Sequence, residues 1–309
     1  IAQLPWFGED GDSVLYLSSA VDAVPGDGNG TTDLFLTDIA TLATERVSLA
    51  APDAFVATGG NASTTGYISA QRAISDDGRY AVFMSAATNL DPQRTPLPSH
   101  GSSQIFTVDR KTGVSTQVSG GPPSAVPDVP TLFSTEASMS ADGRFILYAS
   151  YRNDIVPGDT NGFGDIFLWD RQTGSSRRVS VNAFGTQADA ESHSPAISAD
   201  GLHATFVSDA TNLTTDLLFS IGNIFHVDLS SGAITLMSRD SIGNAANAGS
   251  DNPAISGDGR LIVFESYASN LIGNDTNGKA DVFWHDRSTG LTSRASVSSA
   301  GAQGDDDSY

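Results

Sequence analysis

The chain has 309 residues, 39% of them hydrophobic, and contains no cysteine. The lack of cysteine excludes disulfides, thiolate metal sites and cysteine nucleophiles. Sixteen Lys and Arg residues against 36 Asp and Glu residues give a formal net charge of −20. This excess of acid disfavours binding to nucleic acids or to anionic lipid, because both require a positive field on the protein. No apolar run approaches the roughly 18 residues of a membrane span, so we expect no membrane insertion.

One pattern recurs five times along the chain and is clearest between Asp142 and Gly174. It consists of an Asp-Gly turn, an apolar strand, a polar loop, a second strand and a hairpin turn. The five Asp-Gly turns lie 67, 65, 58 and 58 residues apart, and their acids are Asp10, Asp77, Asp142, Asp200 and Asp258. Helical periodicity is weak, and short β-branched and aromatic runs alternate with clusters of Gly, Asp, Asn and Ser. This pattern is typical of an all-β fold.

Each repeat contains enough apolar runs for four strands. In the fourth repeat the predicted strands are 195–198, 204–208, 223–228 and 233–238, and in the fifth they are 253–256, 261–266, 281–286 and 291–296. A four-stranded antiparallel meander cannot bury both faces alone, so such units stack radially as the blades of a β-propeller.

We expect a single propeller domain over residues 1–309. Its blades are predicted at approximately 1–50, 68–120, 135–181, 193–239 and 251–297, followed by a closing segment at 298–309. The two ends of the chain fall at equivalent points of the repeat, which favours five whole blades in a closed ring. Five blades of a larger array are the alternative.

Three sequence blocks carry a family resemblance: SADGRFILYAS, PGDTNGFGDIFLWDRQTG and SHSPAISADG. They resemble the TolB-like β-propeller repeat, a relative of the tryptophan-aspartate repeats, and the similarity covers essentially the whole chain. The resemblance implies four-stranded antiparallel blades. It does not imply one function, because this repeat occurs in periplasmic binding proteins, peptidase gating domains, polysaccharide-active enzymes and surface proteins.

A loop with the sequence Asp-x-Asn-Gly-x-x-Asp occurs in three repeats, each time 17 residues after the Asp of the Asp-Gly turn. Calcium takes roughly six to eight oxygen ligands from carboxylates, amides and backbone carbonyls. The motif offers side-chain oxygens at positions 1, 3 and 7 and a carbonyl at position 5. We therefore expect up to three structural Ca²⁺ ions, with the ligands Asp27, Asn29, Asp33, Asp159, Asn161, Asp165, Asp275, Asn277 and Asp281.

The alternative interpretation of this motif is turn chemistry, in which Asn-Gly makes the turn and the acids cap it. The fourth repeat has a loop of the same length with Leu217, Phe219 and Asn223 at the equivalent positions, so the loop can be built without acids. An EF-hand is excluded because the terminal Glu and flanking helices are missing. The second repeat has a longer stretch at 91–101, where we expect no ion.

The sequence Asp-Arg-x-Thr-Gly follows the second apolar strand in three repeats, at 109–113, 170–174 and 286–290. We expect a hairpin in which the Asp accepts backbone amides and the Gly adopts positive φ. An arginine-based anion site is the alternative.

Catalytic signatures are few. His226 and His285 lie near Asp228 and Asp286 at strand ends, which suggests a base with an orienting acid. The other repeats carry unrelated residues at these places, so variable strand positions are the favoured interpretation. Trp169 and Trp284 are predicted to pack within the sheets rather than to stack on sugars.

These features predict a non-catalytic, calcium-stabilised bacterial propeller that is extracellular, on the cell surface or periplasmic. Its expected role is to bind a protein or a glycan, or to serve as a building block of a surface assembly. The main alternative is a polysaccharide-active lyase or hydrolase with its site at the propeller mouth. A third possibility is self-assembly as one segment of a larger adhesin or filament.

Overall fold

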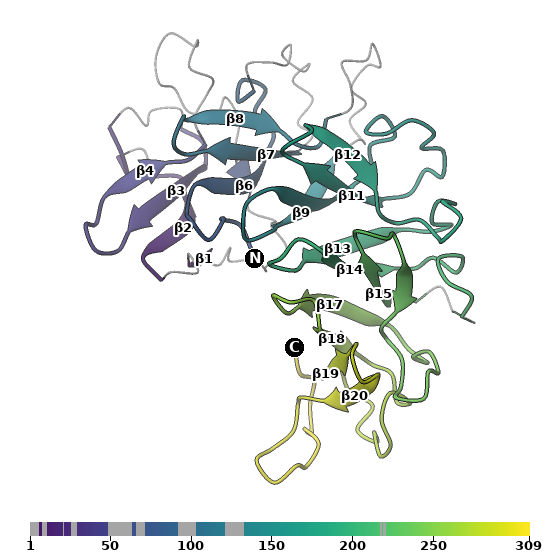
Figure 1. Ribbon diagram of the computed structural model, residues 1–309. Helices are drawn as coiled ribbons and strands as arrows, with labels where there is room; N and C mark the ends of the chain where they lie inside the picture. The colour runs from purple at the N-terminus through teal and green to yellow at the C-terminus, as the bar shows by residue number, and fades with distance from the viewer. Residues whose placement is uncertain are drawn as a thin grey trace. The chain divides into compact units, whose positions relative to one another are not determined.

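A computed structural model describes residues 6–7, 11–20, 22–25, 30–48, 64–65, 72–91, 103–120, 133–216, 218 and 221–309. Every regular element in these segments is a β-strand. The strands form five antiparallel sheets, and in each sheet four strands follow one another in sequence order (Figure 1). The all-β prediction is confirmed. In the described part of the chain no helix has the length and hydrophobicity needed to cross a membrane.

The first sheet contains β1 (Trp6–Phe7), β2 (Ser13–Ser18), β3 (Asp33–Asp38) and β4 (Thr44–Arg46). The second contains β5 (Thr64–Thr65), β6 (Tyr80–Ser85), β7 (Gln104–Asp109) and β8 (Val114–Gln117). The third contains β9 (Ser134–Met139), β10 (Phe145–Ser150), β11 (Asp165–Asp170) and β12 (Ser175–Arg178). The fourth contains β13 (Ser192–Ile197), β14 (His203–Ser208), β15 (Asn223–Asp228) and β16 (Ile234–Leu236). The fifth contains β17 (Ser250–Ile255), β18 (Leu261–Ser266), β19 (Asp281–Asp286) and β20 (Leu291–Arg294).

The chain divides into two compact units. The first comprises Ile1–Asp159 and Leu168–Arg177, and the second comprises Thr160–Phe167 and Arg178–Tyr309. Within the first unit β9 lies against β6 and β7, and within the second unit β17 lies against β13, β14 and β15. In both units the first strand of one sheet thus packs on the preceding sheet, as propeller blades require. The single domain over 1–309, its blade boundaries and the closed five-bladed ring remain predictions.

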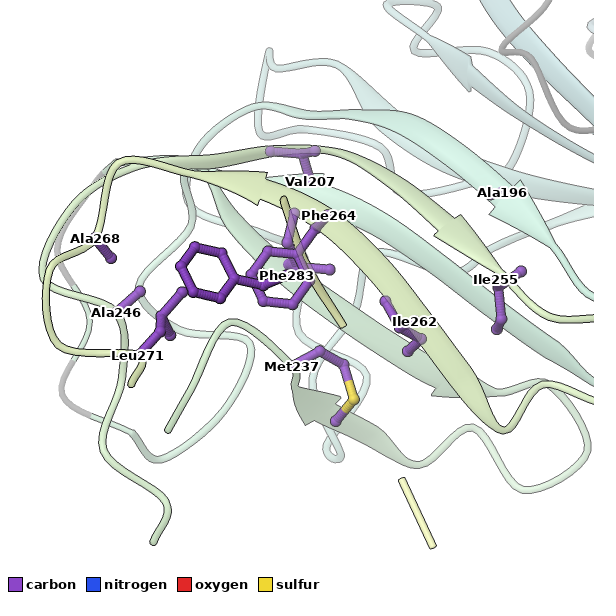
Figure 2. Close-up of a cluster of buried hydrophobic side chains, with 11 residues drawn as sticks. Ala196, Val207, Met237, Ala246, Ile255, Ile262, Phe264, Ala268, Leu271 and Phe283 are labelled. Carbon is purple, nitrogen blue, oxygen red and sulfur yellow. The ribbon is translucent and has the colours of Figure 1, made fainter. Parts of the chain in front are cut away.

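Buried apolar side chains of the fourth and fifth sheets form one continuous core in the second unit (Figure 2). Phe264 and Phe283 are fully buried cross-strand partners in β18 and β19, with ring centroids 6.0 Å apart. The same aromatic pair recurs in other sheets as Tyr16–Phe35, Phe83–Phe106 and Phe206–Phe225. Such a pair contributes about 0.5–1.5 kcal/mol beyond the area it buries. Repetition of the pair gives these four blades a similar centre.

The Asp-Arg-x-Thr-Gly segments form the expected hairpins. The Oδ1 atoms of Asp109, Asp170 and Asp286 accept a hydrogen bond from the backbone amide two residues later, at 3.0, 2.9 and 2.9 Å. Gly113, Gly174 and Gly290 have φ of 71°, 64° and 73°. The arginines of these segments donate to the carbonyl of the turn glycine in the same blade, in the pairs Arg110–Gly78, Arg171–Gly143 and Arg287–Gly259. The guanidinium groups are therefore engaged in the turns, and the hairpin prediction is confirmed.

The first strands of the fourth and fifth sheets begin three residues earlier than predicted, at Ser192 and Ser250 instead of Pro195 and Pro253. A proline has no amide hydrogen to donate to the sheet ladder, so it interrupts the regular pairing of an antiparallel strand. Each strand instead continues through a β-bulge, where the register shifts and Ser194 and Asn252 adopt φ of 50°. The bulge accommodates the proline by removing local residues from the ladder.

Candidate functional site

The last Asp of each loop motif is buried at the start of the third strand of its sheet. Asp33, Asp165 and Asp281 have no exposed surface. In each case Oδ1 accepts a hydrogen bond from a serine hydroxyl 15 residues later, from Ser48 at 2.6 Å, Ser180 at 2.5 Å and Ser296 at 2.6 Å. The same serine oxygen accepts the backbone amide of the residue after the Asp, at 3.1, 3.1 and 3.2 Å. These carboxylates therefore belong to the interior of the sheet.

A buried arginine faces each of these carboxylates from the end of the fourth strand. The ion-pair distances are 3.9 Å for Arg46–Asp33, 3.4 Å for Arg178–Asp165 and 3.4 Å for Arg294–Asp281. The three arginine side chains are only 3%, 7% and 4% exposed. A buried carboxylate needs such a partner, because an uncompensated charge in the interior is strongly destabilising.

Sequence analysis missed these arginines, although the repeats contain the signal. The residue 13 positions after the motif's last Asp is Arg in each of the three blades with the motif. The corresponding pairs in the other two blades are neutral, Gln104 with Gln117 and Asn223 with Leu236. Acid and base therefore change together between repeats of one chain, which is the behaviour of a contacting pair.

At Asp165, burial and the polar neighbours have opposite effects on the pKa of the carboxyl group. Burial raises the pKa of its carboxyl group, and the hydrogen bond from Ser180 and the charge of Arg178 oppose that rise. Asn161 also donates from Nδ2 to Asp165 Oδ2 at 3.0 Å and to the Ala188 carbonyl at 3.1 Å. The polar neighbours thus favour the ionised form that burial disfavours.

The fifth blade brings both ends of its motif together. Arg294 lies 3.3 Å from Asp275 Oδ2 through Nη2 and 3.4 Å from Asp281 Oδ2 through Nε. Gln303 donates from Nε2 to Asp275 Oδ1 at 2.8 Å and to Asp281 Oδ2 at 3.3 Å. Asn277 instead donates to the Gly304 carbonyl at 3.0 Å and accepts the Lys279 amide at 2.9 Å. The two acids thus converge on a guanidinium and an amide, whereas the asparagine holds the loop backbone.

The loop of the third blade is described in full, and that of the first blade only from Gly30 onward. In the third blade Gln187 Oε1 accepts the amides of Thr160 and Asn161, both at 3.2 Å, as Gln303 Oε1 accepts the amide of Thr276 at 3.3 Å in the fifth. The fourth blade, which lacks the motif, has Ala245 at this position. Asp159 belongs to the first compact unit, and Asn161 and Asp165 belong to the second. Asp27 and Asn29 lie outside the described residues.

The existing partners of these carboxylates bear on whether the loops can bind calcium. The carboxylate and amide oxygens are ligands that calcium accepts. In the fifth blade, however, Arg294 and Gln303 already bind both carboxylates. Over the described ranges no group of three or more His, Asp or Glu side chains is arranged to hold a metal ion. An ion at this loop would have to displace the guanidinium, and calcium binding stays a prediction.

The two histidines considered as catalytic bases are buried in the sheets. His226 Nε2 lies 3.2 Å from His203 Nδ1, and burial lowers the pKa of His226 to about 3. His285 Nδ1 lies 2.8 Å from Thr292 Oγ1, whose hydroxyl donates to the Arg239 carbonyl, so Nδ1 carries the proton. Burial likewise lowers the pKa of His285 to about 4. Both side chains are neutral at pH 7.

A pocket of about 460 Å³ lies in the second unit beside β13, β14, β17 and β18. We call it the acidic pocket and define it by six lining residues, His193, Asp209, Asp251, Glu265, Tyr267 and Tyr309. Neither His226 nor His285 lines it. Its volume falls within the range of small-molecule sites, roughly 300–1,000 Å³.

Neutral groups hold the carboxylates of the acidic pocket. Asp251 Oδ1 accepts the backbone amide of Asn252 at 2.7 Å, and Glu265 Oε2 accepts Asn252 Nδ2 at 3.0 Å. Asp209 Oδ1 accepts the Gly222 amide at 2.6 Å. Asp251 and Glu265 are directly opposite each other in the β17–β18 pair. Sequence analysis missed this juxtaposition because the β-bulge, which sets the register, was not predicted.

No family model matches the sequence, and no curated protein matches it either. Among solved structures, a putative TolB from Agrobacterium tumefaciens is similar with a TM-score of 0.51 and 18% identity, over 94% of this chain and 79% of that chain. An oligogalacturonate lyase in complex with manganese gives 0.53 and 14%, over 93% of this chain and 63% of the lyase. A puromycin hydrolase gives 0.51 and 14%, over 94% of this chain and 36% of the hydrolase. This chain therefore spans less than two thirds of either enzyme. The likenesses establish a TolB-like β-propeller fold.

Proposed function

We propose that this chain is a non-catalytic β-propeller module that binds a protein or a glycan at the acidic pocket. The observation that carries the proposal is the pocket itself, a concave site whose carboxylates are held by neutral donors and face a cavity of ligand size. The histidines with strongly lowered pKa values, His226 and His285, do not line this cavity. The TolB-like fold supports a binding role as one of several that a propeller serves.

An enzyme acting on a polysaccharide is the second candidate. The likeness to an oligogalacturonate lyase and the facing pair Asp251 and Glu265 favour it, because a glycosidase uses two carboxyl groups. The acidic pocket disfavours uronate substrates, since its carboxylates would repel those of the sugar. A neutral glycan is therefore the substrate class that this candidate requires.

The proposal places the protein outside the bacterial cytoplasm, in the periplasm, on the cell surface or in the medium. Its support is the net charge of −20, the absence of cysteine and the three loops rich in oxygen ligands. We propose that calcium binds these loops as an added stabiliser by exchanging with the arginine. A site filled at a hundred times its dissociation constant would add about 2.7 kcal/mol. The same proposal includes a role as a building block of a surface assembly. Light scattering tests this role, and a molar mass that rises with protein concentration would support it.

Turnover assays distinguish the two candidates. The full chain is incubated with a panel of neutral glycans and with oligogalacturonates, and new reducing ends and unsaturated products are measured. We expect no saturable turnover of any glycan. Saturable turnover that disappears in Glu265→Gln, while this variant keeps the thermal melt of the parent chain, would overturn the non-catalytic proposal in favour of the enzyme.

A further inference from the structure

We infer that the acidic pocket binds an organic cation, an ammonium or guanidinium group on a short aliphatic stem. The inference rests on the proposed binding function and gives the chemical class of its ligand. Asp209 follows β14, Asp251 lies in β17 and Glu265 lies in β18, so three carboxylates from three parts of the second unit line one cavity. Among the described residues that line this cavity there is no Lys or Arg.

The pair of acids across β17 and β18 is the first argument. Like charges directly opposite each other in an antiparallel pair destabilise a sheet. The corresponding cross-strand pair is His193 with Val207 in the fourth sheet and Thr135 with Ala149 in the third. The acid pair is therefore not required by the blade architecture. A bound cation would relieve the repulsion it creates.

The hydrogen bonds of these acids also favour a cationic ligand. Each carboxylate has one oxygen oriented by a neutral donor, at Asp251 Oδ1, Glu265 Oε2 and Asp209 Oδ1. Within the described residues none of the three forms an ion pair. This contrasts with Asp33, Asp165 and Asp281, each of which has an arginine. No described residue donates a side-chain or backbone hydrogen bond to the second oxygen of these acids, which can therefore accept from a ligand.

The aromatic and apolar wall indicates an organic cation rather than a hard metal ion. Tyr267 and Tyr309 line the pocket as residues that are 55% and 79% exposed, and the neighbouring Tyr267 side chain is the largest cause of the raised pKa of Tyr309. Their rings and Val207, which also lines the pocket, offer contacts for an aliphatic stem and a ring face for a cation. The described acids and histidines form no group arranged for a metal. A free amine or the side chain of a basic residue in a partner protein would supply this chemistry.

Isothermal titration calorimetry of the full chain tests the inference. Cadaverine and agmatine represent free amines, and a short blocked peptide containing one Lys and one Arg represents a protein partner. 1-Pentanol is the uncharged control. We expect at least one cationic probe to bind saturably and the alcohol not to bind. The stronger probe then identifies the source, a free amine or a protein side chain.

Variants of the pocket acids test whether the cationic probe binds in the acidic pocket. Glu265→Gln and Asp251→Asn should each weaken the cationic probe about tenfold or more, whereas Asp305→Asn, which removes an exposed acid outside the pocket, should leave binding unchanged. Thermal melts serve as the folding control. Failure of all cationic probes, equal binding to all variants, or complete displacement of the probe by millimolar Ca²⁺ would overturn the inference. If the cation inference is overturned but a glycan from the panel binds without turnover, the proposed binding function stands and only the ligand class is wrong.

Discussion

Arg294 is the positively charged partner of two buried carboxylates, one in the loop before β19 and one at its first residue. It contacts both Asp275 and Asp281, and neither acid is more than 5% exposed as a side chain. Breaking a buried ion pair by removing one partner costs about 3–5 kcal/mol. We therefore expect Arg294→Leu to lower the free energy of unfolding by about 3 kcal/mol, measured by chemical denaturation.

The fourth blade supplies the matched control for this change. Its equivalent pair is Asn223 with Leu236, which carries no charge. Adding Asp281→Asn to Arg294→Leu copies that pair, so the double variant should recover much of the lost stability. A double variant as unstable as the sum of the two single variants would show that the ion pair contributes no coupling.

His226 gives a prediction on pH dependence. Its pKa in the folded state is lowered to about 3 from the ordinary 6.5, chiefly by burial. The unfolded chain therefore binds the proton more tightly, and stability should fall as the pH drops from about 6.5 towards 3. The loss from this group between pH 7 and pH 4 is on the order of 3 kcal/mol at most. Denaturation curves of His226→Gln at both pH values should show a smaller loss than the parent chain. An equal loss would mean that His226 is protonated freely in the folded state.

Among the elements, the Asp-Gly turn of the fifth sheet packs on the sheet before it. A Cβ atom at Gly259 would overlap the ring of His203, the first residue of β14. Gly290 has a similar φ, 73° against 68°, but nothing lies within 4 Å of the position of its Cβ. Both substitutions by alanine incur the cost of positive φ, about 1–2 kcal/mol. Gly259→Ala alone also forces the two sheets apart.

We therefore expect Gly259→Ala to lower the free energy of unfolding by about 1–3 kcal/mol more than Gly290→Ala does. Thermal or chemical denaturation of both variants measures the difference. Equal losses would show that this turn does not support the packing of the fifth sheet on the fourth.

Much of the element structure was accessible from the repeat. The third strands of the fourth and fifth sheets, Asn223–Asp228 and Asp281–Asp286, have the predicted bounds. The first strands were predicted to begin at Pro195 and Pro253, three residues too late, because a β-bulge at Ser194 and Asn252 carries each strand past its proline and is not visible in the apolar pattern. The acidic pocket could not be predicted, because it depends on the register of β17 against β18 and on packing between sheets.

At the scale of the whole molecule, sequence and structure indicate different partners for the carboxylates of the three acidic loops. The spacing of Asp, Asn and Asp indicates a calcium site by ligand chemistry alone. The structure adds an arginine and, in the fifth blade, a glutamine that join the same carboxylates. The arginine lies 13 residues after the last Asp of the motif. A search limited to the motif therefore does not find this ion pair. The buried acids Asp33, Asp165 and Asp281 are thus balanced by arginines of their own sheets.

The most direct test of this account is the thermal unfolding of the full chain, followed by circular dichroism in excess EDTA and across a calcium titration. We predict that the chain in EDTA keeps its β-sheet signal at 25 °C and unfolds cooperatively, because the arginines already compensate the buried acids. Calcium should then raise the midpoint by only a few degrees, roughly the effect of 1–3 kcal/mol on a chain of this size. Loss of the β-sheet signal in EDTA, restored by calcium, would contradict the account and make the ion a requirement of the fold.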